Sequence, residues 1–151
     1  MNKKEATKLG MMFASDCIAF RVRALNRVIT NLYDVSLKPF GITVNQTTIL
    51  AMLALVGAVG PGRIGQALVM EKSTVSRNLE RMRKNGWVAV TQEEGGKAQT
   101  ITVTEAGRKL LAALHPEWEK AQAAAARLLG KEGIAAVKSL HETVRQTTGS
   151  A

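Results

Sequence analysis

The chain has 151 residues, and 21 Lys and Arg against 12 Asp and Glu give it a formal net charge of +9 at pH 7. This length allows one domain with its own hydrophobic core, and the basic balance favours a polyanionic partner, with nucleic acid ahead of a membrane surface. The one cysteine, Cys17, excludes an internal disulfide, and the start of the chain lacks a secretory signal, so we expect a cytoplasmic protein.

After a loose start, residues 16–37 predict a long helix. Some of its apolar residues recur at heptad spacing, and others lie elsewhere on the same helix. Two apolar faces predict packing against the rest of the domain on one side and against another chain on the other. The heptad positions are Ile18, Val22, Leu25, Ile29 and Leu32, and the additional apolar residues are Phe20, Val28 and Val35.

Cys17 lies at the start of this predicted helix, beside Asp16. A helix N-terminus favours a reactive thiolate, whereas the adjacent carboxylate disfavours it. A redox-sensing role and ordinary packing of a small apolar side chain therefore both remain open for Cys17.

The stretch 41–62 contains no charged side chain. Thr43 and Gln46 have the spacing of a capping box ahead of the apolar run 49–59, which predicts a helix start. The run is too short to span a membrane, so it predicts a buried helix and no membrane partner.

A glycine-rich turn over residues 57–62 and a short helix over 64–69 lead into a basic helix over 70–84, which is the order of a helix-turn-helix. On the last of these helices an apolar stripe must face a core, while the opposite face is polar and cationic. Taken alone, this pattern also fits an ordinary amphipathic helix with solvated charges. The stripe consists of Val75, Leu79 and Met82, and the opposite face of Ser73, Arg77 and Lys84, flanked by Thr74, Glu80 and Arg81.

Free backbone N–H groups in the first turn of the basic helix favour a phosphate, and Arg77 is placed to donate two hydrogen bonds to a guanine edge or a phosphate.

The segment after the basic helix predicts a wing. Asn85 and Gly86 predict a helix stop, followed by β-rich runs over 87–91 and 100–103. The chain is therefore predicted to be mainly α-helical with a small β wing, a winged helix-turn-helix.

Thr104 predicts the N-cap of another long helix. Pro116 predicts a kink in it near His115, and Gly130 predicts its end. A last helix over 131–146 and a frayed tail complete the chain. The apolar side of the long helix carries Leu110, Leu111, Leu114, Trp118, Ala121, Ala125 and Leu128, and that of the last helix carries Ile134, Val137, Leu140 and Val144.

Several motifs, taken in their order, resemble the MarR family of bacterial winged-helix transcription regulators. The resemblance covers residues 14–147. The matching motifs are residues 70–79 in the recognition helix, Trp87 and Val88 in the strand after it, 103–108 at the entry into the dimer helix, and Tyr33, Asp34, 40–43 and Gln46 between the first and second helices.

The resemblance implies one MarR-like domain over 1–151, in which helices over 14–38 and 104–147 join a homodimer and winged-helix regions over 42–103 grip a pseudo-palindromic site on double-stranded DNA. It also implies a repressor, released by a small aromatic or anionic effector that binds between the dimer helices and the winged domain. The implied groove contacts are Ser73, Thr74, Ser76 and Arg77, with Asn78 and Arg81 nearer the phosphates and Arg63 and Lys72 as further backbone contacts.

The wing departs from the family pattern. Where the family usually carries arginines, this chain has Gly95, Gly96 and Lys97 behind two glutamates. Only Lys97 keeps the charge, and lysine lacks the planar fork of arginine. We therefore expect DNA specificity to come mainly from the recognition helix. Val69 also replaces the small residue or glycine common in the preceding turn.

Other functions have less support from the residues. His115 and His141 lie far apart, with no cysteine or histidine at metal-ligand spacing, so no metal or cofactor site is predicted, and no set of side chains indicates an enzyme. The alternatives are a non-specific architectural DNA-binding protein, a winged-helix protein-interaction module, and a peroxide- or redox-sensing regulator that uses Cys17.

Overall fold

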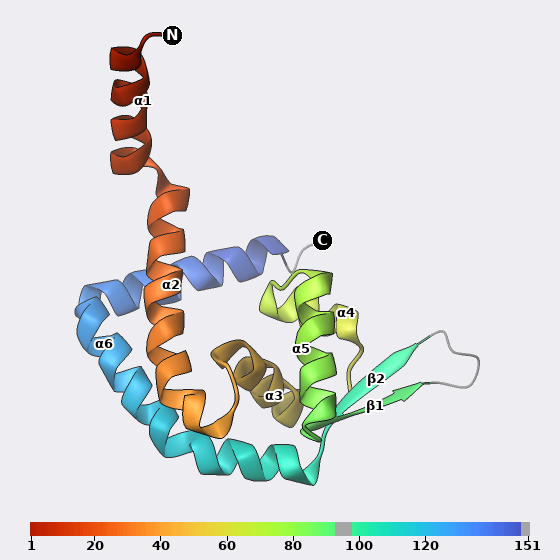
Figure 1. Cartoon of the computed structure of the whole chain (residues 1–151). Helices are drawn as coiled ribbons and strands as arrows, with labels where there is room; N and C mark the ends of the chain where they lie inside the picture. Colours follow the sequence, from red (N-terminus) through yellow and green to blue (C-terminus); the bar gives the residue numbers. More distant parts are fainter. Residues whose placement is uncertain (93–97, 149–151) are drawn as a thin grey trace.

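The computed structural model of the chain describes residues 1–92 and 98–148. In chain order its elements are α1 (Lys3–Asp16), α2 (Ile18–Leu37), a 3-10 turn η1 (Lys38–Phe40), α3 (Val44–Val56), α4 (Pro61–Leu68), α5 (Lys72–Lys84), β1 (Val88–Gln92), β2 (Gln99–Val103) and α6 (Glu105–Thr148). In Figure 1, α3, α4 and α5 gather beside the two strands, α6 curves around this cluster and across α2, and α1 projects from the end of α2. The predicted fold class, mainly α-helical with a small β wing, is confirmed.

The N-terminal segment differs from the prediction. Residues 3–16 form helix α1, so the predicted loose start is wrong. A capping box explains the helix: the Asn2 side chain accepts from the Glu5 N–H at 3.0 Å, and the Glu5 carboxylate accepts from the Asn2 N–H at 2.8 Å. The next helix then begins at Ile18 rather than at residue 16, because Cys17 is extended, with φ −68° and ψ 111°.

The capping box predicted for α3 is confirmed. Thr43 and Gln46 bond reciprocally, and the Asp34 carboxylate accepts from the Val44 N–H at 2.7 Å, which ties the end of α2 to the start of α3. The helix is buried on one side only. Leu53 is fully buried, whereas Leu55, about 200° further around the helix, is 84% exposed, so the predicted buried helix has an open face.

The turn before α4 is shorter than predicted. The helix begins at Pro61 instead of residue 64, because Gly60 serves as N-cap and proline suits the first helical position. Val59, ahead of the helix, exchanges two backbone hydrogen bonds with Ile101 of β2, at 2.8 and 3.2 Å. This bridge, which the sequence did not predict, anchors the wing to the segment between α3 and α4.

Buried side chains from every element except α1 and the short turn meet in one core. Because both strands and α5 contribute to it, the wing and α5 hold a fixed position relative to each other. The members of the core are Leu37, Ile42, Ile49, Leu50, Leu53, Ile64, Val75, Leu79, Met82, Val88, Ile101 and Leu114.

Helix α6 keeps helical dihedral angles at Pro116, so it continues through the proline, and the kink expected near His115 stays a prediction. Leu114 and Ala121, buried on either side of the proline, hold this part of the helix against the rest of the chain. The end predicted at Gly130 is confirmed, since this residue has φ 65° and ψ 176° and divides α6 into two helical segments.

Within the described residues, none of the helices alone has the length and apolar character to cross a membrane, although the bent pair Ile18–Phe40 and Val44–Val56, at 77°, passes by length and composition.

Candidate nucleic-acid interface

Helix α5 presents one polar, cationic face outward. Its apolar stripe is confirmed, since Val75, Leu79 and Met82 are no more than 6% exposed. Ser73 and Arg77, on the opposite side, are exposed. At the start of α5 the Glu71 side chain makes no capping bond, and the Thr74 N–H donates to the Glu71 carbonyl oxygen at 2.9 Å. This arrangement leaves the backbone N–H groups of Lys72 and Ser73 for an anion.

Two of the predicted contact residues bond within the helix itself. The Arg77 guanidinium donates to the Thr74 hydroxyl at 3.5 Å, and the Asn78 amide donates to the Thr74 carbonyl oxygen at 2.9 Å. Thr74 and Asn78 are half-buried. The outward face is therefore formed chiefly by Ser73, Arg77 and Arg81, with Thr74 and Asn78 at its edge.

The cations of α5 fall into two groups. Glu80 forms ion pairs with Arg83 at 3.2 Å and with Lys84 at 3.4 Å. Hydrogen bonds from the Arg83 guanidinium lower the pKa of the Glu80 carboxyl, which keeps it charged. By contrast, Arg77 and Arg81 form no ion pair with any residue in 1–92 or 98–148, so their full charge is available to phosphate.

Sequence reasoning identified Glu80 on this helix but missed its pairing with Arg83. The signal was present, because acidic and basic residues three or four positions apart on a helix are neighbours. The pairing means that Arg83 and Lys84 contribute less positive potential than their number suggests.

The base of the wing is bonded to both flanking helices. The strands pair antiparallel, with Val88 opposite Val103. Beneath them the Trp87 N–H donates to the Met82 carbonyl of α5 at 2.9 Å, and the Thr104 N–H donates to the Trp87 carbonyl at 3.1 Å. Lys97, like the rest of 93–97, lies outside the described residues, so its contact with DNA stays a prediction.

The remaining predicted contacts lie on α4 and at other positions of α5. Arg63 is exposed on α4, and Lys72 is exposed at the first position of α5. Ser76 is also exposed, but it lines a cleft between α5 and the wing instead of the outward face.

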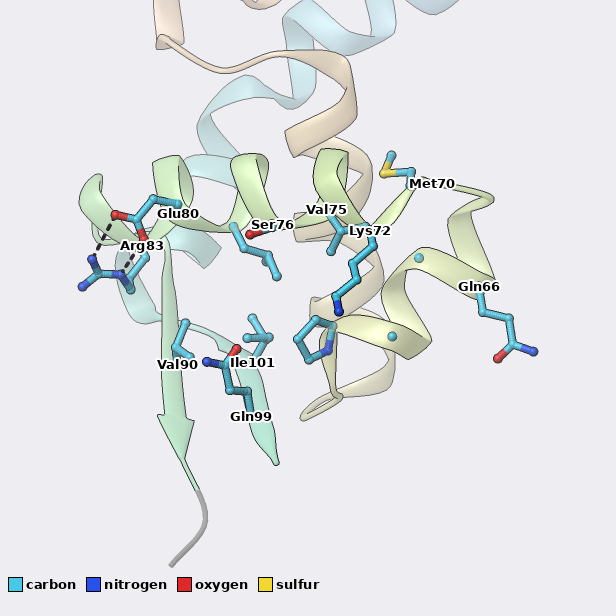
Figure 2. A pocket seen from close by; sticks show the side chains of 14 residues that line it. Gln66, Met70, Lys72, Val75, Ser76, Glu80, Arg83, Val90, Gln99 and Ile101 are labelled. Carbon is cyan, nitrogen blue, oxygen red and sulfur yellow. Dashed lines mark hydrogen bonds and ion pairs between the residues drawn. The ribbon is translucent and has the colours of Figure 1, made fainter. Parts of the chain in front are cut away.

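This cleft has a volume of about 800 Å³ and lies between α4, α5 and the sheet. Its apolar lining includes Val75, Val90 and Ile101, and Gln99 adds a polar group from β2. Figure 2 shows Lys72 extending from α5 into this space. The resemblance implied an effector site between the dimer helices and the winged domain, whereas this cleft lies within the winged domain.

Cys17 and the two histidines do not belong to α5: Cys17 lies between α1 and α2, and His115 and His141 lie on α6. Cys17 is half-buried at the junction of α1 and α2. His115 stacks on Trp118 with ring centroids 6.1 Å apart and approaches Glu119 at 3.9 Å. Among the residues that the structure describes, no three His, Cys, Asp or Glu side chains gather in a group able to hold a metal ion.

Comparison with known proteins accounts for this arrangement. Residues 40–99, from the end of η1 to the start of β2, match the model of the MarR family. The fold matches the Mycobacterium tuberculosis transcriptional regulator MosR with a TM-score of 0.76 and 26% identity, over 91% of this chain and 98% of that one. The winged-helix region of this chain is therefore of the MarR type.

Other MarR-type proteins share the fold at lower identity. A mutant MarR of Escherichia coli in complex with operator DNA matches with a TM-score of 0.75 and 17% identity, over 88% of this chain and 96% of its own. The HTH-type transcriptional regulator YwoH of Bacillus subtilis is 26% identical over 99 residues, which are 66% of this chain and 72% of YwoH. The family resemblance is thereby confirmed: residues 40–99 match the MarR family model, and the fold is similar to that of winged helix-turn-helix transcriptional regulators.

Proposed function

We propose that this MarR-family regulator is a homodimeric repressor that binds a pseudo-palindromic operator, with α5 of each subunit in a major groove. The observation that carries the proposal is the outward face of α5, where Ser73, Arg77 and Arg81 follow one another along the helix and neither arginine has an acidic partner in the described residues. Arginine binds guanine edges and phosphates through two parallel hydrogen bonds. The fold shared with a MarR protein in complex with operator DNA supports this geometry.

Exposed apolar side chains on α2 and α6 support the homodimer. Exposed apolar side chains in this number are typical of an interface, and a two-fold dimer would present two α5 helices about one DNA turn, roughly 34 Å, apart. The exposed apolar residues are Ile18, Phe20, Val22, Leu25, Val28 and Val35 on α2, and Leu128, Val137, Leu140 and Val144 on α6.

Selection of bound sequences from a random duplex library tests the operator. We expect a single pseudo-palindromic motif, with half-site centres about 10 base pairs apart or a multiple of this. Uniform, salt-sensitive coating of any duplex would favour the architectural alternative, because phosphate contacts alone carry no sequence information. Failure to bind any duplex at low salt would leave the protein-interaction module.

We further propose that a small aromatic anion regulates DNA binding from the cleft between α5 and the wing. The apolar lining of the cleft suits an aromatic ring, and Lys72, which forms no ion pair within 1–92 and 98–148, suits a carboxylate. BpsR of Bordetella bronchiseptica, whose DNA binding is regulated by 6-hydroxynicotinic acid, shares the fold at 19% identity, with a TM-score of 0.74 over 86% of this chain and 94% of its own.

Titration of the DNA complex with 6-hydroxynicotinic acid and with benzoate tests the effector. Val90→Trp fills the cleft without removing a predicted DNA contact. We expect the unaltered protein to release DNA and the Val90→Trp variant to stay bound. An equal response of both proteins would place the effector elsewhere, and no response of either would reject regulation by these anions.

A further inference from the structure

Helix α5 carries a single acidic residue, Glu80, among five cations. Glu80 lies seven residues after Ser73 and three after Arg77, which places it about 20° and 60° away from them around the helix. Its side chain is 49% exposed, and it also lines the cleft beside the wing. Glu80 therefore borders the outward face of α5 on the side of the wing, within reach of a partner that contacts Ser73 and Arg77.

A carboxylate on a surface that binds DNA requires an explanation, because it repels phosphate. Arg83 and Lys84 pair with Glu80 at 3.2 and 3.4 Å, so the three side chains together carry one net positive charge. Exposed pairs at this spacing contribute little to the stability of a helix. The ion pairs explain how the carboxylate is accommodated next to DNA, and its remaining hydrogen-bonding capacity indicates what it binds.

The Arg83 guanidinium holds the Glu80 carboxylate in one orientation. Arg83 Nε donates to Oε2 and Arg83 Nη2 donates to Oε1, each at 3.2 Å, and Figure 2 shows both bonds. Lys84 Nζ also lies 3.4 Å from Oε1. Each carboxylate oxygen can accept about two hydrogen bonds. Among the residues that the structure describes, Oε2 accepts only from Arg83, so it keeps an acceptor position for a donor from outside the chain.

A fixed acceptor selects among the bases by the groups that they present in the major groove. Cytosine presents the N4 amino donor, whereas guanine presents O6 and N7 and thymine presents O4, which are acceptors that a carboxylate repels. Adenine presents a donor at N6, but its N7 acceptor lies beside it. Hydrogen bonds from Arg83 lower the pKa of the Glu80 carboxyl, so the group is ionised at neutral pH and only accepts hydrogen bonds. Cytosine is therefore the base that fits Glu80.

We propose that Glu80 is a specificity-determining residue: with α5 in the major groove, its Oε2 atom accepts a hydrogen bond from the N4 amino group of one cytosine in each half-site. Arg83 is a positioning residue, since it acts on the base through Glu80. The inference rests on the operator binding proposed above. It adds a second base-reading position about one helical turn beyond Arg77.

Selection of bound duplexes with the parent protein and with Glu80→Gln tests the inference. We expect a cytosine at one position of each half-site for the parent. For Glu80→Gln we expect this preference to be lost or to change to adenine, which an amide binds through N6 and N7, with the other positions unchanged. The matched control is Glu105→Gln, because Glu105 pairs with Arg108 at 3.0 Å and with Lys109 at 4.0 Å at the start of α6. We expect its motif to equal that of the parent.

A modified operator tests the hydrogen bond itself. N4-methylcytosine still pairs with guanine but presents a methyl group to the major groove in place of the amino N–H. We expect this change to lower the affinity of the parent by about tenfold or more and that of Glu80→Ala by less than about twofold. Arg83→Lys keeps the charge but cannot hold both carboxylate oxygens, and we expect it to lower the preference for cytosine over thymine by about threefold or more.

The outcomes separate the cytosine contact from operator binding as a whole. A parent motif that Glu80→Gln reproduces at every position would reject the cytosine contact and keep operator binding by α5. Equal tightening of every duplex by Glu80→Gln, with the motif unchanged, would show that Glu80 only limits phosphate affinity and would also overturn the proposal. A parent protein that selects no motif would reject operator binding and the cytosine contact together.

Discussion

The hydroxyl of Thr104 donates to the carbonyl oxygen of Gly86 at 2.6 Å, so the N-cap of α6 is bonded to the glycine that follows α5. The same hydroxyl accepts from the Gly107 N–H at 3.1 Å and caps α6. One side chain therefore joins the segment after α5 to the start of α6. We refer to this pair of hydrogen bonds as the joint.

Thr104→Val removes both hydrogen bonds and keeps the shape of the side chain. We expect a loss of about 1–3 kcal/mol in the free energy of unfolding, the usual cost of an N-cap and of an unpaired carbonyl. Urea denaturation measures it. Thr102→Val on β2, where the hydroxyl makes no hydrogen bond that holds two elements together, is the control and is expected to change the free energy by less than about 0.5 kcal/mol. Equal losses would contradict the role of the joint.

Gly107 lies where α6 crosses the wing base. A Cβ atom there would lie 2.3 Å from the Trp87 carbonyl oxygen and 2.9 Å from Val103 Cγ2. Gly107→Ala is therefore expected to cost at least about 2 kcal/mol, because backbone must move. Gly62→Ala, in open space on α4, is the matched change and is expected to be neutral or to stabilise by up to about 1 kcal/mol. Thermal unfolding of both variants measures these changes in stability. A Gly107→Ala protein as stable as the parent would contradict the close packing of Gly107 against Trp87 and Val103.

Val69, at the turn between α4 and α5, is the one non-glycine residue with positive φ among those the structure describes, with φ 52° and ψ 47°. A branched side chain is strained in this region, and Val69 is 62% exposed, so it recovers little by burial. Val69→Gly is expected to stabilise the fold by about 1 kcal/mol. Ala67→Gly, on the same helix in ordinary helical geometry, is expected to destabilise it by about as much. The two substitutions are expected to change the free energy of unfolding in opposite directions, which denaturation of both variants tests. A less stable Val69→Gly protein would show that the turn is unstrained.

Tyr33, the single tyrosine of the chain, donates its hydroxyl proton to Gln122 and so links α2 to α6. Burial raises the pKa of this tyrosine above its usual 10.0. Because the folded value exceeds the unfolded one, this contribution to stability is full below pH 10.0 and is lost as the pH rises through the folded value. Tyrosinate absorbance of the native protein measures the shift directly, and Tyr33→Phe is expected to remove this part of the alkaline loss. A Tyr33 hydroxyl that titrates in the native protein with the ordinary pKa of 10.0 would contradict the raised pKa.

Features set by neighbouring residues were predictable from the sequence. The Thr43 and Gln46 capping box and the buried stripe of Val75, Leu79 and Met82 depend on spacings of three and four residues, and both are present. The face of α5 that carries Ser73 and Arg77 follows from the same periodicity. Its contacts with DNA remain a prediction, because they depend on a partner.

Features that join distant segments were not predictable. Val59 bridges to Ile101, 42 positions later, and the Gly107 position is decided by Trp87 and Leu50 from other elements. Helix α1 was missed for a different reason. None of its residues is buried, so its sequence does not carry the apolar pattern that packing against a core imposes on a helix. The cleft beside α5 likewise needs residues from α4, α5 and both strands.

The affinity of Arg77→Ala for the selected operator tests the central claim most directly. Arg127→Ala, on α6, removes the same charge from an exposed position away from α5 and serves as the control. We predict that Arg77→Ala lowers operator affinity by about tenfold to a hundredfold and affinity for an unrelated duplex by less than about threefold, since a base contact is lost, while Arg127→Ala changes both by less than about twofold. Operator affinity and footprint unchanged in Arg77→Ala would contradict the account that α5 reads the DNA.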